Sequence, residues 1–128
     1  LTGSDGVLRG ASGGHCDTAA AARLAIIVAP LVRGRIPTLV EQVTTCVTPG
    51  SSIDILVTDH GIAVNPARPE LAQRLREAGL EVVSIDWLRA RALQLTGEPQ
   101  PIAFTDKVVA VVRYRDGSVI DVVHQVVE

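Results

Sequence analysis

A glycine pair followed by polar residues is the first feature of the sequence that could do chemistry. Gly13 and Gly14 precede His15, Cys16 and Asp17, and a run of four alanines follows. Glycines let the backbone approach a ligand closely, and the N–H groups and positive dipole end of a following helix favour phosphate or carboxylate. His15 could donate to a substrate carboxylate or carbonyl. The same glycine pair also fits a purely structural tight turn that needs positive φ.

A second polar cluster follows the apolar run 55–57. Thr58, Asp59 and His60 come directly after that run, and Gly61 follows them. Ligands bind outside the carboxyl ends of strands in open α/β sheets, so these side chains are predicted to project into a crevice there. An ordinary exit from strand to loop, with Asp59 forming the turn, fits the same residues.

Three arginines are candidates for holding a carboxylate or a phosphate. Arg33 and Arg35 flank Gly34 in a short connector, and Arg68 lies in the proline-containing turn 65–69. A guanidinium group can bind such anions through two parallel hydrogen bonds. A solvated connector is the alternative for the first two arginines, and a structural role in the rigid turn is the first reading for Arg68.

The elements that must position these residues alternate between apolar runs and amphipathic segments. The continuous apolar run 24–29, closed by Pro30, predicts a central strand buried on both faces. Alternating strands and helices favour an α/β layer fold with a mostly parallel sheet flanked by helices over 1–106, and a C-terminal antiparallel β-hairpin packed on it over 107–128. Further strands are predicted over 36–43, 53–58, 80–85, 107–114 and 118–126, and helices over 17–23, 70–78 and 86–95.

Composition excludes several classes of function. The 128 residues are 47% hydrophobic, and 12 basic and 14 acidic residues nearly cancel, with no cluster typical of nucleic-acid or membrane binding. Two widely spaced cysteines and the lack of a long apolar stretch predict a reduced, cytoplasmic protein. Because the sequence contains no methionine, we expect it to be part of a longer chain. Dinucleotide, P-loop, serine hydrolase and zinc protease motifs are all missing.

Taken in order, these segments resemble the second half of coenzyme A transferases. The shared pattern is a GG-x-x-D loop at 13–17, an apolar strand, the connector 33–37 and a V-T-D-x-G-I-A segment at 57–63. Within that superfamily, segments 34–37, 58–68, 96–99 and 113–118 resemble the citrate lyase alpha-subunit family most closely.

The resemblance implies a transferase that exchanges acetyl for citryl on the thiol of an acyl carrier protein, releasing acetate. It implies a citryl lyase beta subunit as a further partner, a homo-oligomer within a larger complex, no metal, and no tightly bound cofactor beyond the carrier's coenzyme A-derived prosthetic group. The glutamate nucleophile of better-known relatives lies upstream of the GG loop, so no catalytic residue is assigned here and the fragment alone is expected to be inactive. The candidate residues are Gly13, Gly14, His15 and Asp17 for the thioester arm, and Thr58, Asp59, Gly61, Arg33, Arg35 and Arg68 for the substrate.

Two other functions remain open on the sequence. A sugar-phosphate isomerase of the same broad fold could use the GG-x-x-D and V-T-D-x-G segments to hold a phosphate and a sugar. A non-catalytic assembly module would instead use the valine-rich strands and exposed helix faces in an oligomer.

Overall fold

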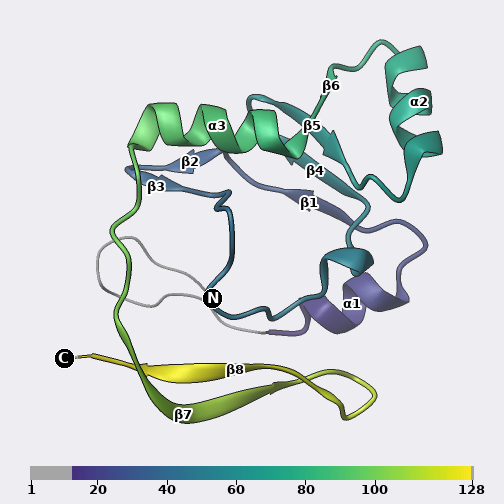
Figure 1. Cartoon of the computed structure of the whole chain (residues 1–128). Helices are drawn as coiled ribbons and strands as arrows, with labels where there is room; N and C mark the ends of the chain where they lie inside the picture. Colours follow the sequence, from purple (N-terminus) through teal and green to yellow (C-terminus); the bar gives the residue numbers. More distant parts are fainter. Residues whose placement is uncertain (1–12, 128) are drawn as a thin grey trace.

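A computed structural model describes residues 13–127, which form one four-stranded sheet, two two-stranded ribbons and three α-helices (Figure 1). The sheet has the strand order β1-β4-β5-β6. In chain order the elements are α1 (His15–Ala21), β1 (Ile26–Val28), β2 (Val32–Arg33), β3 (Ile36–Pro37), the 3-10 turn η1 (Gly50–Ser52), β4 (Ile55–Thr58), β5 (Gly61–Val64), α2 (Pro69–Glu77), β6 (Val82–Val83), α3 (Ile85–Thr96), β7 (Phe104–Arg113) and β8 (Val119–Val126).

The sheet combines parallel and antiparallel neighbours. Strand β1 pairs with β4 in parallel, β4 with β5 antiparallel, and β5 with β6 in parallel. Parallel pairs are therefore the majority, and the predicted α/β fold with a C-terminal antiparallel hairpin is confirmed. Strand β5 was not predicted, because the sequence after Thr58 was interpreted as a loop.

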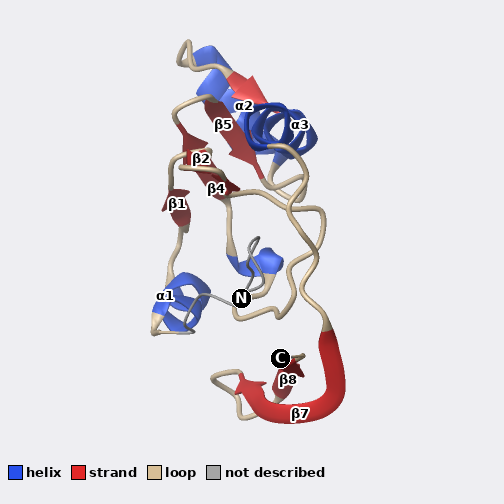
Figure 2. Cartoon of the chain, turned by 90° about the vertical axis from the view of Figure 1, so that its left-hand side faces the viewer, coloured by secondary structure: helices blue, strands red, loops and turns tan. Residues whose placement is uncertain are grey.

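Helix α3 covers one face of the sheet and carries the core (Figure 2). Its Leu88 and Ala92 lie on the inward side and are fully buried against Leu31 and Ala63, whereas Leu95 on the same helix is 48% exposed. The Oγ atom of Ser84 accepts a hydrogen bond from the third residue of the first turn, which caps the helix at its start. The core is small, and it lies between α3, β5 and the residues that follow β1.

The prediction that the apolar run 24–29 is a central strand buried on both faces was wrong. Strand β1 is at the edge of the sheet, and within the described residues it pairs only with β4. Ile26 is 49% exposed, Ile27 40% and Val28 77%. A continuous apolar run indicates that a strand is suited to burial, but it carries no information about which segments cover it.

The strand predicted over 36–43 is also shorter than expected. Only Ile36 and Pro37 pair, in the two-residue antiparallel ribbon with β2. Proline has no backbone N–H, so it ends the ladder on one side. Thr38 then donates its N–H to the carbonyl of Leu31 at 2.9 Å, and the chain leaves in an irregular path.

The C-terminal hairpin of β7 and β8 extends from the sheet on a long connection (Figure 2). It begins at Phe104 rather than at Lys107. Two hydrogen bonds join it to the segment that precedes η1: Oδ2 of Asp121 accepts from the Cys46 N–H at 2.6 Å, and Oγ1 of Thr45 donates to a carbonyl of β8 at 3.0 Å. These two contacts hold the ribbon against the rest of the chain.

Candidate functional site

The polar cluster after β4 forms a tight hairpin turn. The Oγ1 atom of Thr58 donates to the carbonyl of Gly61 at 2.9 Å and accepts from the N–H of His60 at 3.1 Å. The Thr58 hydroxyl and the backbone N–H of His60 therefore stabilise the turn itself, which corrects the prediction that the Thr58 side chain projects into an open crevice. The His60 side chain lines a cavity beside α3. The chain reverses at once because Gly61 begins β5 as the antiparallel partner of β4.

Gly61 is the residue that permits this reversal. Its φ of +142° is one that side-chain-bearing residues rarely adopt, and a Cβ atom there would lie 2.9 Å from Cγ2 of Val83. Both the backbone conformation and the close approach of β6 therefore require glycine. Gly61 has a structural role, and it sets the position of the turn before it.

Asp59 connects the turn to the chain that leaves β1. Its Oδ1 accepts a 2.7 Å hydrogen bond from the backbone N–H of Leu31. That bond is the largest cause of a lowered Asp59 pKa, and His60 beside it acts in the same direction. Because Leu31 immediately precedes β2, Asp59 fixes the connector that bears Arg33 and Arg35.

Arg33 and Arg35 lie on either side of Gly34, whose φ of +61° lets the chain turn between β2 and β3. Both side chains line a cavity of about 490 Å³ together with Thr96 and the segment 98–100 that follows α3. Among residues 13–127 neither guanidinium group forms an ion pair. Glu98 lines the same cavity. Two exposed guanidinium groups beside a cavity of this size could hold an anion with two or more carboxylates.

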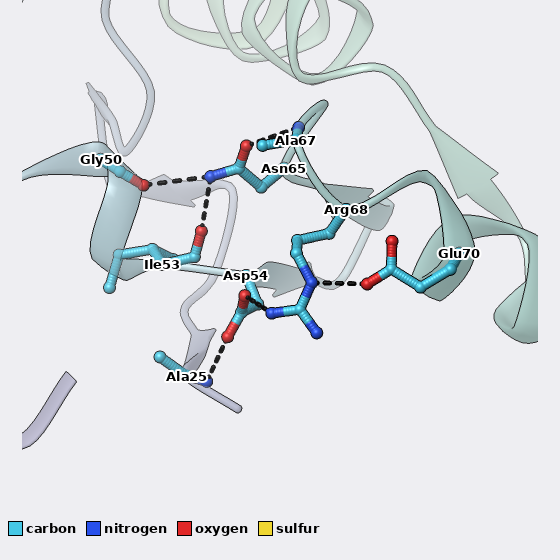
Figure 3. Close-up of polar contacts among 8 residues, drawn as sticks. All are labelled: Ala25, Gly50, Ile53, Asp54, Asn65, Ala67, Arg68 and Glu70. Carbon is cyan, nitrogen blue, oxygen red and sulfur yellow. Dashed lines mark hydrogen bonds and ion pairs between the residues drawn. The ribbon is translucent and has the colours of Figure 1, made fainter. Parts of the chain in front are cut away.

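Arg68 is placed differently, at the amino-terminal end of β4 (Figure 3). Its Nη1 donates to Oδ1 of Asp54 at 2.5 Å and its Nε donates to Oε1 of Glu70 at 2.6 Å, while Oδ2 of Asp54 accepts from the Ala25 N–H at 2.8 Å. The hydrogen bond that Arg68 donates to Glu70 is the largest cause of a raised Arg68 pKa, and the same bond lowers the pKa of Glu70. The positive charge of Arg68 is therefore already balanced by the carboxylates of Asp54 and Glu70.

Asn65 holds the turn that carries Arg68 (Figure 3). Its Nδ2 donates to the carbonyls of Gly50 at 3.1 Å and Ile53 at 2.8 Å, and its Oδ1 accepts from the N–H of Ala67 at 3.0 Å. Arg68 lines a cavity of about 550 Å³ beside this turn. The geometry fits the structural reading of Arg68, and it separates Arg68 from the connector arginines by the length of β4.

The GG turn lies at the start of α1. Gly13 has a φ of +50°, and Gly14 is the N-cap of the helix. Nδ1 of His15 lies 2.9 Å from Oγ1 of Thr48, in the segment before η1, and Asp17 is exposed on the first turn of the helix. His15 lines a cavity of about 260 Å³ with residues of α1 and β1.

The predicted residues thus form two groups at opposite ends of β1 and β4. Thr58, Asp59 and Gly61 lie at the carboxyl ends and are joined through Leu31 to the arginine connector. The GG turn and Arg68 lie toward the amino-terminal ends, where His15, directly after the turn, and Arg68 line separate cavities. Arg68 and the connector arginines therefore line different cavities.

Several residues at these cavities were not predicted. Asp54, the partner of Arg68, was not singled out, and neither were Thr96 and Glu98 beside the connector arginines. Trp87 and Arg91, which line a cavity with His60, were also missed, although their i, i+4 spacing places them on one face of α3.

Among residues 13–127 no group of three or more His, Cys, Asp and Glu side chains could hold a metal ion. No helix in that range has the length and apolar character that crossing a membrane requires.

Comparison with known proteins identifies the family. The family model described as citrate lyase, alpha subunit (CitF), matches residues 1–126. The chain is 84% identical to the citrate lyase alpha chain of Escherichia coli over 128 residues, and 71% identical to that of Klebsiella pneumoniae over 126 residues. It covers 25% of the length of each of these relatives.

A solved structure has the same fold. The crystal structure of a Streptococcus mutans protein assigned as the alpha subunit of citrate lyase, in complex with citrate, superimposes with a TM-score of 0.93 at 54% identity. The match covers all of this chain and 25% of that one. The chain therefore belongs to the citrate lyase alpha-subunit family and spans a quarter of the length of the relatives that it matches.

Proposed function

We propose that this chain is part of a coenzyme A transferase subunit that exchanges acetyl for citryl on the thiol of an acyl carrier protein. The bond between the carrier sulfur and the acetyl carbonyl carbon breaks, and a new bond forms between that sulfur and a carboxyl carbon of citrate. One carboxylate oxygen of citrate leaves with the acetyl group, so that acetyl thioester and citrate give citryl thioester and acetate. The observation that carries the proposal is the whole-chain match to a citrate-bound alpha subunit. A citryl lyase beta subunit then cleaves the product within the same oligomeric, cytoplasmic complex.

Citrate binding is assigned to the carboxyl-end group of residues. Arg33 and Arg35 form no ion pair among residues 13–127 and line, together with Glu98, a cavity of about 490 Å³, which is large enough for a small polycarboxylate. Asp59 positions the connector through Leu31 rather than contacting substrate. Arg68, which was predicted to bind substrate as well, is not included, because Asp54 and Glu70 already occupy its guanidinium group.

The GG turn is assigned to the thioester arm. The first N–H groups of a helix have no partner within the helix, so those at Gly14 and His15 are suited to stabilising an oxyanion or binding an amide carbonyl of the arm. Gly13, directly before them, turns the chain into the helix with its φ of +50°. The prosthetic group is an extended chain. The GG turn that contacts the arm therefore does not need to adjoin the citrate cavity lined by Arg33 and Arg35. This agrees with the positions of the GG turn and the connector arginines at opposite ends of β1 and β4.

The proposal is tested with the full-length subunit, the carrier protein in its acetyl form and isotopically labelled citrate. We expect equimolar formation of labelled citryl carrier and acetate. Turnover of a pentose phosphate without acyl exchange would contradict the proposal and would indicate a sugar-phosphate isomerase instead. The 128-residue chain alone is expected to be inactive in the same assay.

A further inference from the structure

A cavity of about 360 Å³ lies between the β4–β5 turn and the outer side of α3, and its lining combines an indole, a guanidinium group and an imidazole. It is lined by His60, Trp87, Ala90, Arg91 and Gln94. None of these side chains was used in the proposed acyl exchange. The cavity is within the size range of sites that bind small molecules.

The cavity follows from the two faces of α3. Leu88 and Ala92 occupy the inward face and are fully buried. Trp87, Arg91 and Gln94 stand at i, i+4 and i+7 on another side of the same helix. Trp87 is 48% exposed although it is large and apolar, and it leaves part of a flat indole face open to a ligand.

Arg91 brings a positive charge to this cavity, and Nε2 of His60 lies 3.9 Å from Oδ2 of Asp59. The polar contact of Arg91 is with a neutral side chain, since its Nη1 donates to Oε1 of Gln94 at 3.3 Å. Arg89, two positions earlier, instead lies 3.7 Å from carboxylate oxygens of both Glu41 and Asp86. Arg91 forms no ion pair within residues 13–127. It is therefore available to an anion, whereas its neighbour is not.

We propose that this cavity binds a purine nucleotide moiety, with the base stacked on Trp87 and the phosphate held by Arg91 and His60. An exposed indole favours a planar aromatic ring, and a guanidinium group favours the bidentate contact that a phosphate offers. His60 adds a hydrogen-bond donor from the turn that faces α3, and Gln94 adds amide donors and acceptors for the edge of the base. The nucleotide is either free in solution or the nucleotide end of a coenzyme A-type group.

The test measures binding of adenosine 5′-monophosphate, coenzyme A and ribose 5-phosphate to the full-length subunit by calorimetry. Trp87→Ala and Arg91→Gln are each expected to weaken binding of the monophosphate roughly 10-fold, which is the effect of losing one base stack or one charged contact. Ribose 5-phosphate should bind more weakly and be insensitive to Trp87→Ala. Arg89→Gln, on the same helix, is the matched control and should bind like the unaltered protein.

Two comparisons make the outcome decisive. Tighter binding of coenzyme A than of the monophosphate, with both weakened by Trp87→Ala, identifies the nucleotide end of a prosthetic arm as the occupant; equal affinities identify a free nucleotide. Unchanged affinity in both Trp87→Ala and Arg91→Gln, or no binding of either nucleotide to the unaltered subunit, overturns the proposal. Both side chains are outside the core, so circular dichroism of the variants should match the unaltered protein. The acyl-exchange assay can succeed or fail independently of this result.

Discussion

The backbone N–H of Leu31 donates a 2.7 Å hydrogen bond to Oδ1 of Asp59, and this contact joins the chain segments that leave two neighbouring parallel strands. Leu31 is fully buried and is followed by β2, which carries Arg33. The position of the arginine connector thus depends on an aspartate in a turn 28 residues later in the sequence. Asp59 is a positioning residue in this account.

Asp59→Ala should therefore weaken citrate binding without removing any group that touches citrate. Loss of the acceptor for the Leu31 N–H releases the connector, and we expect the KM for citrate to rise roughly 10-fold. Asp59→Asn keeps a carbonyl oxygen that can accept the same bond and should restore most of the affinity. Equal defects in both variants would show that the negative charge, rather than the hydrogen bond, is what matters.

Gly61→Ala should destabilise the β4–β5 hairpin. The added Cβ would meet Val83 at 2.9 Å in a backbone conformation that alanine rarely adopts, and we expect a loss of about 1–3 kcal/mol. Hydrogen exchange of the β5 amides in the full-length subunit measures the change. Gly50→Ala is the control, because Gly50 has no positive φ and open space around its Cα, and it should leave β5 protection unaltered.

Leu88→Ala should disrupt the core beneath α3. Leu88 is fully buried against Leu31, so its truncation leaves a cavity and is expected to cost about 2–5 kcal/mol. Leu95→Ala, on the same helix at 48% exposure, should cost much less. Thermal denaturation of the two variants, compared in one buffer, decides the point, and similar losses would contradict the described core.

Acidification should release the C-terminal hairpin. The Asp121 pKa lies below its ordinary value, first because the Cys46 N–H donates to the carboxylate and second because the Val122 N–H does so. A carboxyl with a lowered pKa stabilises the folded state above its ordinary pKa, and the stabilisation is lost as the pH falls through the lowered value. Protection of the Cys46 amide, corrected for intrinsic exchange, should therefore be constant near neutrality and fall below about pH 4. Asp121→Asn should abolish that pH dependence.

Helices α2 and α3 were the most predictable part of the fold, whereas α1 begins at His15, two residues before its predicted start. Pro69 at the first position and Gly79 beyond the end set the limits of α2, and Ser84 and Gly97 do the same for α3. These are local signals, which act through the residue's own backbone. The sheet was less predictable, because the pairing of β5 with β6 and the exposure of β1 depend on segments far away in the sequence.

The candidate site divides in the same way. The GG turn and the connector arginines were identifiable from residue type and local spacing. The ion pair of Arg68 with Asp54 was not identifiable, because Asp54 lies 14 residues earlier and becomes a neighbour of Arg68 only through the β4–β5 reversal. The Asp59–Leu31 bond and the Trp87–His60 cavity likewise exist only once the chain is folded.

The most direct test of the account compares the KM for citrate in two variants of the full-length subunit. The double substitution Arg33→Gln, Arg35→Gln removes both cations of the connector, and loss of charged hydrogen bonds should raise the KM for citrate roughly 10- to 100-fold. Arg68→Gln should leave that KM nearly unchanged, since the guanidinium group of Arg68 is held by Asp54 and Glu70. A large rise in Arg68→Gln with an unchanged KM in the double variant would place the citrate site at the other end of β4 and contradict the account.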